Sequence, residues 1–423
     1  MARDSLYPVS VKAGKPILGM LPTGWQKLSL EKCLNIEARK AYIQDNQEYD
    51  LVTVKRSRGG VIRREHLKGK DISVKSQFYI KEGDFLISKR QIVHGACGLV
   101  PKELSGSIVS NEYCVLTGKS GFYLPYMEFL SESLYFQQTC FHSSIGVHIE
   151  KMIFKLDSWF KWPFNIPPLS EQKRIVKILS TWDKAISVTE KLLANSQQQK
   201  KALMQQLLTG KKRLLDENGV RFSGEWEVVR LKQLIHEEKK RNRDNHIQRV
   251  LSVTNHSGFV LPEEQFSKRV ASEDVSTYKI VKKNQYGYNP SRLNVGSFAR
   301  LDNYDEGVLS PMYVVFSINH ERLNSDYFLN WMSSNEAKQR IAGSTQGSVR
   351  DSVGFDALCS FSFSLPTLME QQKIAAVLSA ADAEMSMLEK KLACLKEEKK
   401  ALMQQLLTGK RRVNVESEET VSA

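Results

Sequence analysis

The stretch KKALMQQLLTG occupies residues 200–210 and occurs again, letter for letter, at residues 399–409. It belongs to a longer match, in which residues 166–213 align without a gap to residues 365–412. Weaker matches continue upstream at a nearly constant offset: Trp25 aligns with Trp226, Gly95 with Gly296, and IVSNEYCVL at 108–116 with VLSPMYVVF at 308–316. A solenoid would need contiguous repeats of a few dozen residues. The sequence therefore predicts two similar halves, each a variable block followed by a strongly preserved segment.

The preserved segment has the pattern of a long amphipathic helix. Apolar residues recur at heptad spacing from 175 to 207 and from 374 to 406, with no Pro or Gly inside either run. Pro168 and Pro366 precede the runs, and Gly210 and Gly409 follow them, as expected at helix boundaries. Each helix of about 40 residues would be roughly 60 Å long. The predicted coiled-coil positions are Ile175, Leu179, Trp182, Ile186, Leu193, Leu203 and Leu207, then Ile374, Leu378, Met385, Leu388, Leu392, Leu395, Leu402 and Leu406.

Three central positions of the first stripe are polar, namely Thr189, Ser196 and Lys200. Such residues weaken a plain apolar seam, and they either set the register or face another protein. The best partner for each helix within the chain is the other copy. If the two copies pair antiparallel, their variable blocks are related by a pseudo-two-fold axis, which suits a split and asymmetric DNA site.

Both variable blocks are predicted to be compact mixed α/β domains. Strand-like runs with internal turn signals occur at 76–88, 106–116, 276–289 and 306–318, and helical stretches at 126–139 and 325–341. The fold class is therefore α/β mixed: two pseudo-repeated globular domains joined by two long helices.

Basic and polar residues gather around the predicted turns of both blocks. Arginine can bond a guanine edge bidentately, Asn or Gln can bond an adenine edge, and Lys or Arg can also neutralise phosphates. A solvated surface charge is the competing explanation for any single residue. The candidate DNA-binding residues are Arg56, Arg58, Arg63, Arg64, Arg90 and His94 in the first half, and His256, Arg292, Asn294, Gln346 and Arg350 in the second.

The net charge of +14 favours a polyanionic partner, and the 41% hydrophobic content is enough for packed cores. The six cysteines form no CxxC pair, so we expect reduced buried thiols, no metal site and a cytoplasmic location. YNPSR at 288–292 departs from the amino-methyltransferase motif, and GSTQGSVR at 343–350 lacks the GK[ST] of a nucleotide P-loop. The pattern favours a protein that reads DNA without catalysing a reaction. A coiled-coil adaptor without sequence-specific DNA binding, or an enzyme acting on DNA alone, are the alternatives.

IPPLSEQKRI at 166–175, LPTLMEQQKI at 365–374 and the two KKALMQQLLTGK copies resemble the specificity (S) subunit of type I restriction-modification enzymes. YGYNPSRLNVGSFARLDNYDEGVLSPMYVVF at 286–316 is also similar to the target recognition domains of that family, whereas the first block has FLISKRQIVHGAC without the Asn-Pro. The resemblance implies target recognition domains at 1–165 and 214–364, spacer helices at 166–213 and 365–413, and an acidic tail at 414–423.

The resemblance also implies a division of labour. Each target recognition domain reads one half of a bipartite, gapped double-stranded DNA site, and the helices form an antiparallel coiled coil that sets the gap. The helices dock two methyltransferase (M) subunits, which bring S-adenosylmethionine and the adenine-N6 chemistry. Motor-nuclease (R) subunits add ATP- and magnesium-dependent cleavage, while this chain has no catalytic residue and binds no cofactor itself.

Overall fold

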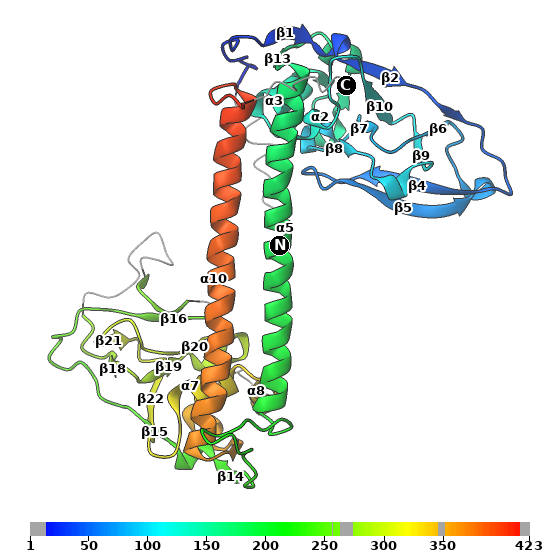
Figure 1. Ribbon diagram of the computed structural model, residues 1–423. Helices are drawn as coiled ribbons and strands as arrows, with labels where there is room; N and C mark the ends of the chain where they lie inside the picture. Colours follow the sequence, from blue (N-terminus) through cyan, green and yellow to red (C-terminus); the bar gives the residue numbers. More distant parts are fainter. Residues whose placement is uncertain (1–13, 256, 263–273, 346–351, 415–423) are drawn as a thin grey trace. The chain divides into compact units, whose positions relative to one another are not determined.

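The computed structural model describes residues 14–255, 257–262, 274–345 and 352–414. The chain forms two compact units (Figure 1). The first combines Met1–Thr189 with Lys391–Ala423, and the second is the continuous stretch Glu190–Lys390. Each unit therefore contains one globular block and half of each long helix. Among the helices of the described segments, none is long and apolar enough to cross a bilayer.

The first unit is built on a four-stranded and a five-stranded sheet. The four-stranded sheet has the order β2 (Leu34–Glu37), β10 (Tyr113–Gly118), β7 (Phe85–Ser88) and β8 (Cys97–Leu99). The five-stranded sheet has the order β3 (Lys40–Ala41), β6 (Gln77–Tyr79), β9 (Ile108–Ser110), β4 (Glu48–Val54) and β5 (Val61–Lys68). Two smaller pairs are β1 (Gln26–Ser29) with β13 (Pro163–Ile166) and β11 (Ser144–Ile145) with β12 (Ile153–Phe154). The helices are α2 (Tyr126–Leu130), α3 (Leu134–His142) and α4 (Leu156–Trp159).

The second unit repeats the central sheet of the first. Its order is β15 (Ile235–Glu237), β22 (Val314–Ile318), β19 (Tyr286–Tyr288) and β20 (Phe298–Arg300). The other pairs are β14 (Glu227–Arg230) with β23 (Ser362–Leu365), β16 (Ser252–Thr254) with β17 (Gly258–Val260), and β18 (Lys279–Lys282) with β21 (Glu306–Leu309). The helices are α7 (Ser325–Met332), α8 (Asn335–Thr345) and α9 (Phe355–Cys359). The mixed α/β prediction is confirmed for both blocks.

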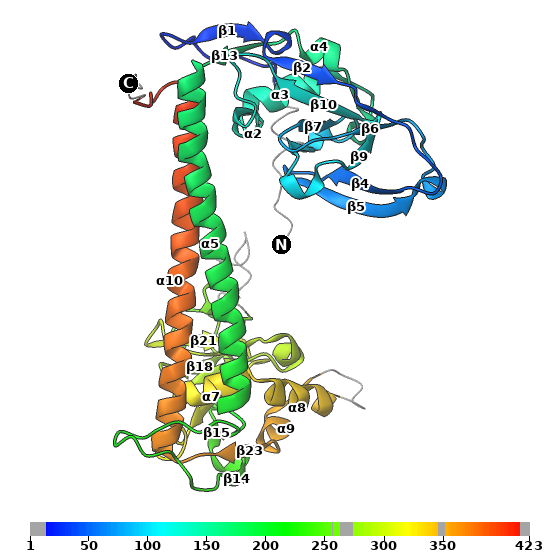
Figure 2. The ribbon, with the colours of Figure 1, turned by 45° about the vertical axis from the view of Figure 1, so that its right-hand side comes forward.

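The two long helices are α5 (Leu169–Leu207) and α10 (Leu368–Leu407). They lie side by side and antiparallel within each unit (Figure 2). In the first unit Lys399 Nζ lies 2.7 Å from Asp183 Oδ1, and in the second Lys200 Nζ lies 2.5 Å from Asp382 Oδ1. The helices end at Leu207 and Leu407, and each end is followed, as predicted, by a glycine with left-handed φ, 68° at Gly210 and 67° at Gly409.

The predicted apolar stripe faces inward along both helices. Its outer ends enter the globular cores: Ile175, Leu179 and Leu406 belong to the core of the first unit, and Leu207, Ile374 and Leu378 to that of the second. Four apolar positions between these ends are only half-buried, namely Leu193, Leu388, Leu392 and Leu395. The polar positions also face the partner helix, because Thr189 and Ser196 are buried and Ser196 Oγ lies 3.4 Å from Glu384 Oε1.

Each unit closes the helix pair with an equivalent cluster around a buried glutamate. Glu171 accepts hydrogen bonds from Trp25 Nε1 at 2.9 Å and from Arg412 Nε and Nη2, both at 2.8 Å. Glu370 accepts the equivalent bonds from Trp226 Nε1 at 3.0 Å and from Arg213 at 2.6 and 2.8 Å. We call these two clusters the clasps. They explain the sequence repeat, because the Arg that follows each LLTGK segment binds the Glu that begins the opposite helix.

Candidate nucleic-acid interface

Three separate segments of the first unit meet around the turn between β4 and β5. Ser57 N donates to the His94 carbonyl at 2.7 Å, and Arg58 N donates to the Gly95 carbonyl at 2.8 Å. Ser57 and Arg58 both have left-handed φ, 55° and 52°, which is uncommon for residues with a side chain. Residues 55–64 carry four of the candidate arginines, and residues 88–95 carry Arg90 and His94. These two stretches are thus bonded to each other through their backbones.

Glu150, on the 3-10 turn Ile149–Lys151, connects these two stretches to a third. Its carboxylate lies 2.7 Å from Arg56 Nη2 and 3.2 Å from His94 Nε2. Burial lowers the pKa of His94, nearby Arg56 lowers it further, and Glu150 opposes both. The buried imidazole supports the loops in this structure, and a contact between His94 and DNA stays a prediction.

Arg63 and Arg64 lie on strand β5 instead of in the turn where the sequence placed them. Leu51 pairs with Glu65 and Val52 with Arg63, so Arg64 is the extra residue of a β-bulge. Bulges redirect side chains and often lie beside functional sites. Arg63 pairs with Asp50 at 3.0 Å, and Arg64 with Glu65 at 3.3 Å.

Every arginine predicted for the first half has a carboxylate neighbour. Besides the pairs above, Arg58 Nη2 lies 3.6 Å from Glu132 Oε2. Arg90 donates two hydrogen bonds to the Glu112 carboxylate, from Nε at 2.6 Å and from Nη2 at 3.3 Å. Exposed ion pairs contribute only about 0–1 kcal/mol, because water screens the charges and ordering the side chains costs entropy. A phosphate or a base edge can therefore replace these carboxylates at low cost.

Arg292 and Asn294 lie on the 3-10 helix Pro290–Val295 of the second unit, and both are exposed. Asn289 Oδ1 accepts from Ser291 N at 3.0 Å and caps this helix, while Ser297 Oγ donates to the Val253 carbonyl at 2.8 Å and fixes it beside β16. Val353 N donates to the Pro290 carbonyl at 3.0 Å. Within the described ranges Arg292 has no ion pair. His256, Gln346 and Arg350 lie outside the described residues.

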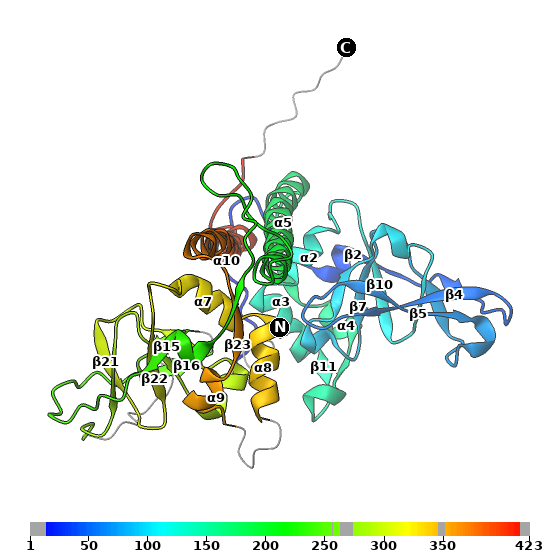
Figure 3. The ribbon, with the colours of Figure 1, turned by 90° about the horizontal axis from the view of Figure 1, so that it is seen from below.

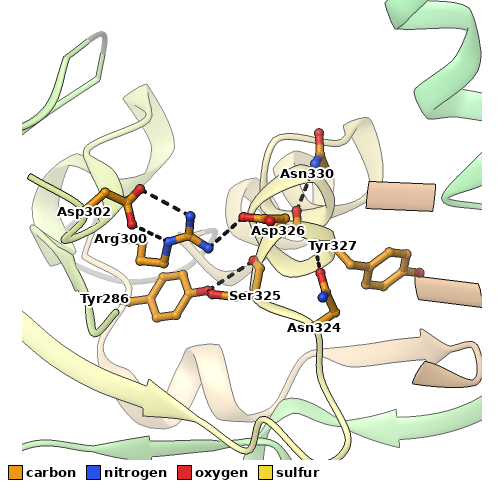
Figure 4. A network of polar contacts seen from close by, with 8 residues as sticks. All are labelled: Tyr286, Arg300, Asp302, Asn324, Ser325, Asp326, Tyr327 and Asn330. Atoms are coloured by element: carbon orange, nitrogen blue, oxygen red, sulfur yellow. Dashed lines mark hydrogen bonds and ion pairs between the residues drawn. The ribbon is translucent and has the colours of Figure 1, made fainter. Parts of the chain in front are cut away.

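Arg300 shows what a structural arginine looks like in the same unit (Figure 4). Its guanidinium binds Asp302 at 2.6 Å and Asp326 at 2.7 Å. Burial lowers the pKa of Arg300, but the bonds to the two carboxylates outweigh that effect and raise it. Tyr286, whose pKa burial raises to about 12, bonds Ser325 at the start of α7. This network attaches β19 and β20 to α7. No pattern in the sequence predicted it.

No group of three or more His, Cys, Asp or Glu side chains in the described part of the chain could hold a metal ion. The candidate interface consists of loops that present arginine, asparagine and backbone groups, which can bond phosphates and base edges.

Two repeated units, each a globular domain with a segment of both long helices, define the class of this protein as a duplicated, two-domain protein. The sequence model of the type I restriction modification DNA specificity domain matches it twice, at residues 22–195 and 223–397. The chain belongs to that family and is a specificity subunit of the type I restriction-modification class. The specificity subunit of the type I restriction enzyme MjaVIII from Methanocaldococcus jannaschii is 26% identical over 313 residues, covering 69% of this chain and 70% of the relative.

Solved structures show the same fold. The HsdS subunit from Thermoanaerobacter tengcongensis matches with a TM-score of 0.51 at 18% identity, covering 92% of this chain and 98% of that one. The S subunit of a type I restriction-modification system from M. genitalium matches with a TM-score of 0.52 at 12% identity, covering 92% and 99%. A chain from a study of complex assembly and conformational transition in the type I R-M system reaches 0.55 at 18% identity, covering 93% and 100%.

Proposed function

We propose that each globular block of this chain reads one half of a bipartite, gapped DNA site. The observation that carries the proposal is how each unit holds its candidate residues. In the first unit the basic β4–β5 turn is bonded to the turn at 92–95, and in the second the 3-10 helix that presents Arg292 is fixed beside β16. Because the two blocks differ in sequence around these loops, the half-sites differ. Helices α5 and α10 set the spacing between them.

The same helices present two equivalent surfaces to two copies of a methyltransferase (M) subunit. The duplicated clasps and the duplicated Lys–Asp pairs support this, because each unit offers the same local chemistry. The M subunits supply S-adenosylmethionine and adenine-N6 transfer, and motor-nuclease (R) subunits supply ATP- and magnesium-dependent cleavage. This chain contributes recognition without catalysis, and the complex acts in the cytoplasm.

The decisive experiment is co-expression of this chain with its neighbouring methyltransferase subunit, followed by genome-wide mapping of methylated adenines. One gapped, asymmetric motif that disappears when this chain is omitted supports the proposal. Methylation that is absent, or unchanged without this chain, would favour the coiled-coil adaptor and contradict the proposal. Methylation by the chain alone would favour an enzyme.

A further inference from the structure

Among the described residues, the β11–β12 hairpin of the first unit carries apolar side chains that stand exposed to solvent. Val147 at its tip is 96% exposed, Ile145 66% and Ile153 39%. Ile145 and Ile153 are direct cross-strand partners, so they lie on the same face. The hairpin projects at the rim of the first unit (Figure 3). Three exposed aliphatic side chains on one short hairpin need an explanation, unlike a single exposed one.

The hairpin is firmly held, so its exposed face is preorganised. Phe154, the residue after Ile153, is buried and lies 5.5 Å from Trp159 between ring centroids. Lys155 N donates to the Ser143 carbonyl at 2.8 Å and closes the hairpin at its base. At Gly146 a Cβ atom would lie 2.9 Å from Met152 Cα, so only glycine permits this close approach of the two strands.

The hairpin is also bonded to the basic loops of the candidate interface. Phe154 N donates to the Lys89 carbonyl at 2.8 Å, and Glu150, six residues after Ser144, holds Arg56 and neighbours His94. An apolar tip beside arginines is the combination that proteins use to contact bases, either at a thymine methyl group or as a wedge between base steps.

We propose that the apolar surface of this hairpin, formed by the cross-strand pair Ile145 and Ile153 and by Val147 at the tip, inserts into a groove of the DNA at the half-site read by the first unit. This inference rests on the proposed function and adds to it an apolar contact that is independent of charge.

A protein partner fits this face less well than DNA does. Three side chains fall far short of the roughly 800 Å² that each partner buries in a stable protein–protein interface. A subunit bound twice would also need the same chemistry in both halves. The corresponding sequence of the second half, GSTQGSVRDSVG at 343–354, is mostly polar. The apolar face is therefore a feature of the first half that the second half lacks in its sequence.

The test uses the complete complex of this chain with its methyltransferase subunit and the duplex motif found by methylation mapping. We expect Val147→Ser to weaken binding to that duplex about five- to twentyfold, because the complex loses part of the apolar surface that Val147 buries on binding DNA. The salt dependence should stay unchanged, because no phosphate contact is lost. Val74→Ser is the matched control: it lies in the same unit, is 47% exposed, and should bind as the unsubstituted complex does.

Two substitutions in the DNA distinguish contact with a thymine methyl group from insertion between base steps. A positive result with either one supports the inference. Uracil in place of thymine removes the methyl group and would weaken the unsubstituted complex but not Val147→Ser. Alternatively, 2-aminopurine fluorescence would rise on binding only when Val147 is present to unstack a step.

Equal affinities of Val147→Ser and Val74→Ser overturn the inference. So does a loss of methyltransferase subunit from the purified complex with DNA affinity unchanged, which would assign the hairpin to a protein contact. Failure of the unsubstituted complex to bind any gapped motif would instead contradict the proposed function.

Discussion

The side chain of Arg292 is the clearest candidate for reading a base. It stands exposed on a capped 3-10 helix, whereas Arg300 in the same unit is bound by two aspartates. We expect Arg292→Ala to cost about 1–3 kcal/mol of binding and to relax one base position of the second half-site. Methylation mapping of the variant measures this. Arg322→Ala, which removes an exposed arginine paired with Glu227, is the control and should leave the motif intact.

The clasps predict a stability effect at single residues. Arg412→Ala leaves the buried Glu171 carboxylate with Trp25 as its remaining side-chain partner, which should cost about 1–3 kcal/mol. Arg411 is exposed and precedes Arg412 directly, so Arg411→Ala removes the same charge without touching the clasp. Thermal unfolding of both variants checks this. Equal midpoints for the two would show that the clasp contributes nothing to stability.

His66 and His94 should titrate on opposite sides of the ordinary histidine pKa. The hydrogen bond to Asp50 raises the pKa of His66 most, and the hydrogen bond to Glu48 raises it further. Burial lowers the pKa of His94. The stabilising contribution of His66 is therefore present below pH 6.5 and lost as the pH rises through its folded pKa. That of His94 is present above pH 6.5 and lost as the pH falls toward its folded pKa.

NMR titration of labelled histidines measures both values. Asp50→Asn should lower the pKa of His66 and leave that of His94 in place. A pKa of His66 at or below 6.5 in the unsubstituted protein would contradict the assigned pairing.

At the scale of elements, the long helices separate into core-anchored ends and a half-exposed middle. Leu378 is fully buried in the core of the second unit, so Leu378→Ala should destabilise that unit by about 2–5 kcal/mol. Met387, nine residues further along α10, is 63% exposed, and Met387→Ala should change stability by less than about 0.5 kcal/mol. Chemical denaturation distinguishes the two. A similar loss in both would mean that α10 is buried uniformly.

The elements that sequence predicted well were those with a strong local signal. Heptad spacing, the flanking prolines and the final glycines located both long helices. The strand-like runs are also strands, but each splits at its turn. In each of the four runs the two parts join different sheets, as β6 and β7 do in 76–88. The helical stretch 126–139 similarly breaks into α2 and α3 at Ser131–Ser133, where Ser133 caps the second helix.

Other features could not be found because they depend on pairs distant in the sequence. Nothing local marks Glu150 as the partner of Arg56, or Glu171 as the partner of Arg412. The bulge that places Arg64 on β5 arises from register with β4, which the sequence of 55–64 does not contain. The sequence identified the basic residues, but only the fold shows which carboxylates form ion pairs with them.

At the scale of the whole molecule, the net charge of +14 coexists with many internal ion pairs. If Arg90 contacts DNA, Glu112 competes with the DNA for it. Glu112→Gln should then strengthen DNA binding a few-fold at low salt, with the gain fading as salt screens the charges. Glu82→Gln removes the same charge from another exposed position and is the control. Titrations of both complexes with the mapped duplex test this, and equal affinities would place Arg90 away from the DNA.

The first unit is assembled from two segments that synthesis separates in time. Residues 1–189 leave the ribosome long before residues 391–412, which bring Met403 and Leu406 to the same core and Arg412 to its clasp. The second unit is one continuous stretch and can complete its core earlier. The first block is therefore translated with part of its apolar surface uncovered, and its core is completed only after α10 has been synthesised. A nonsense mutation shortly after residue 390, which removes Met403, Leu406 and Arg412, would damage the domain encoded at the beginning of the gene.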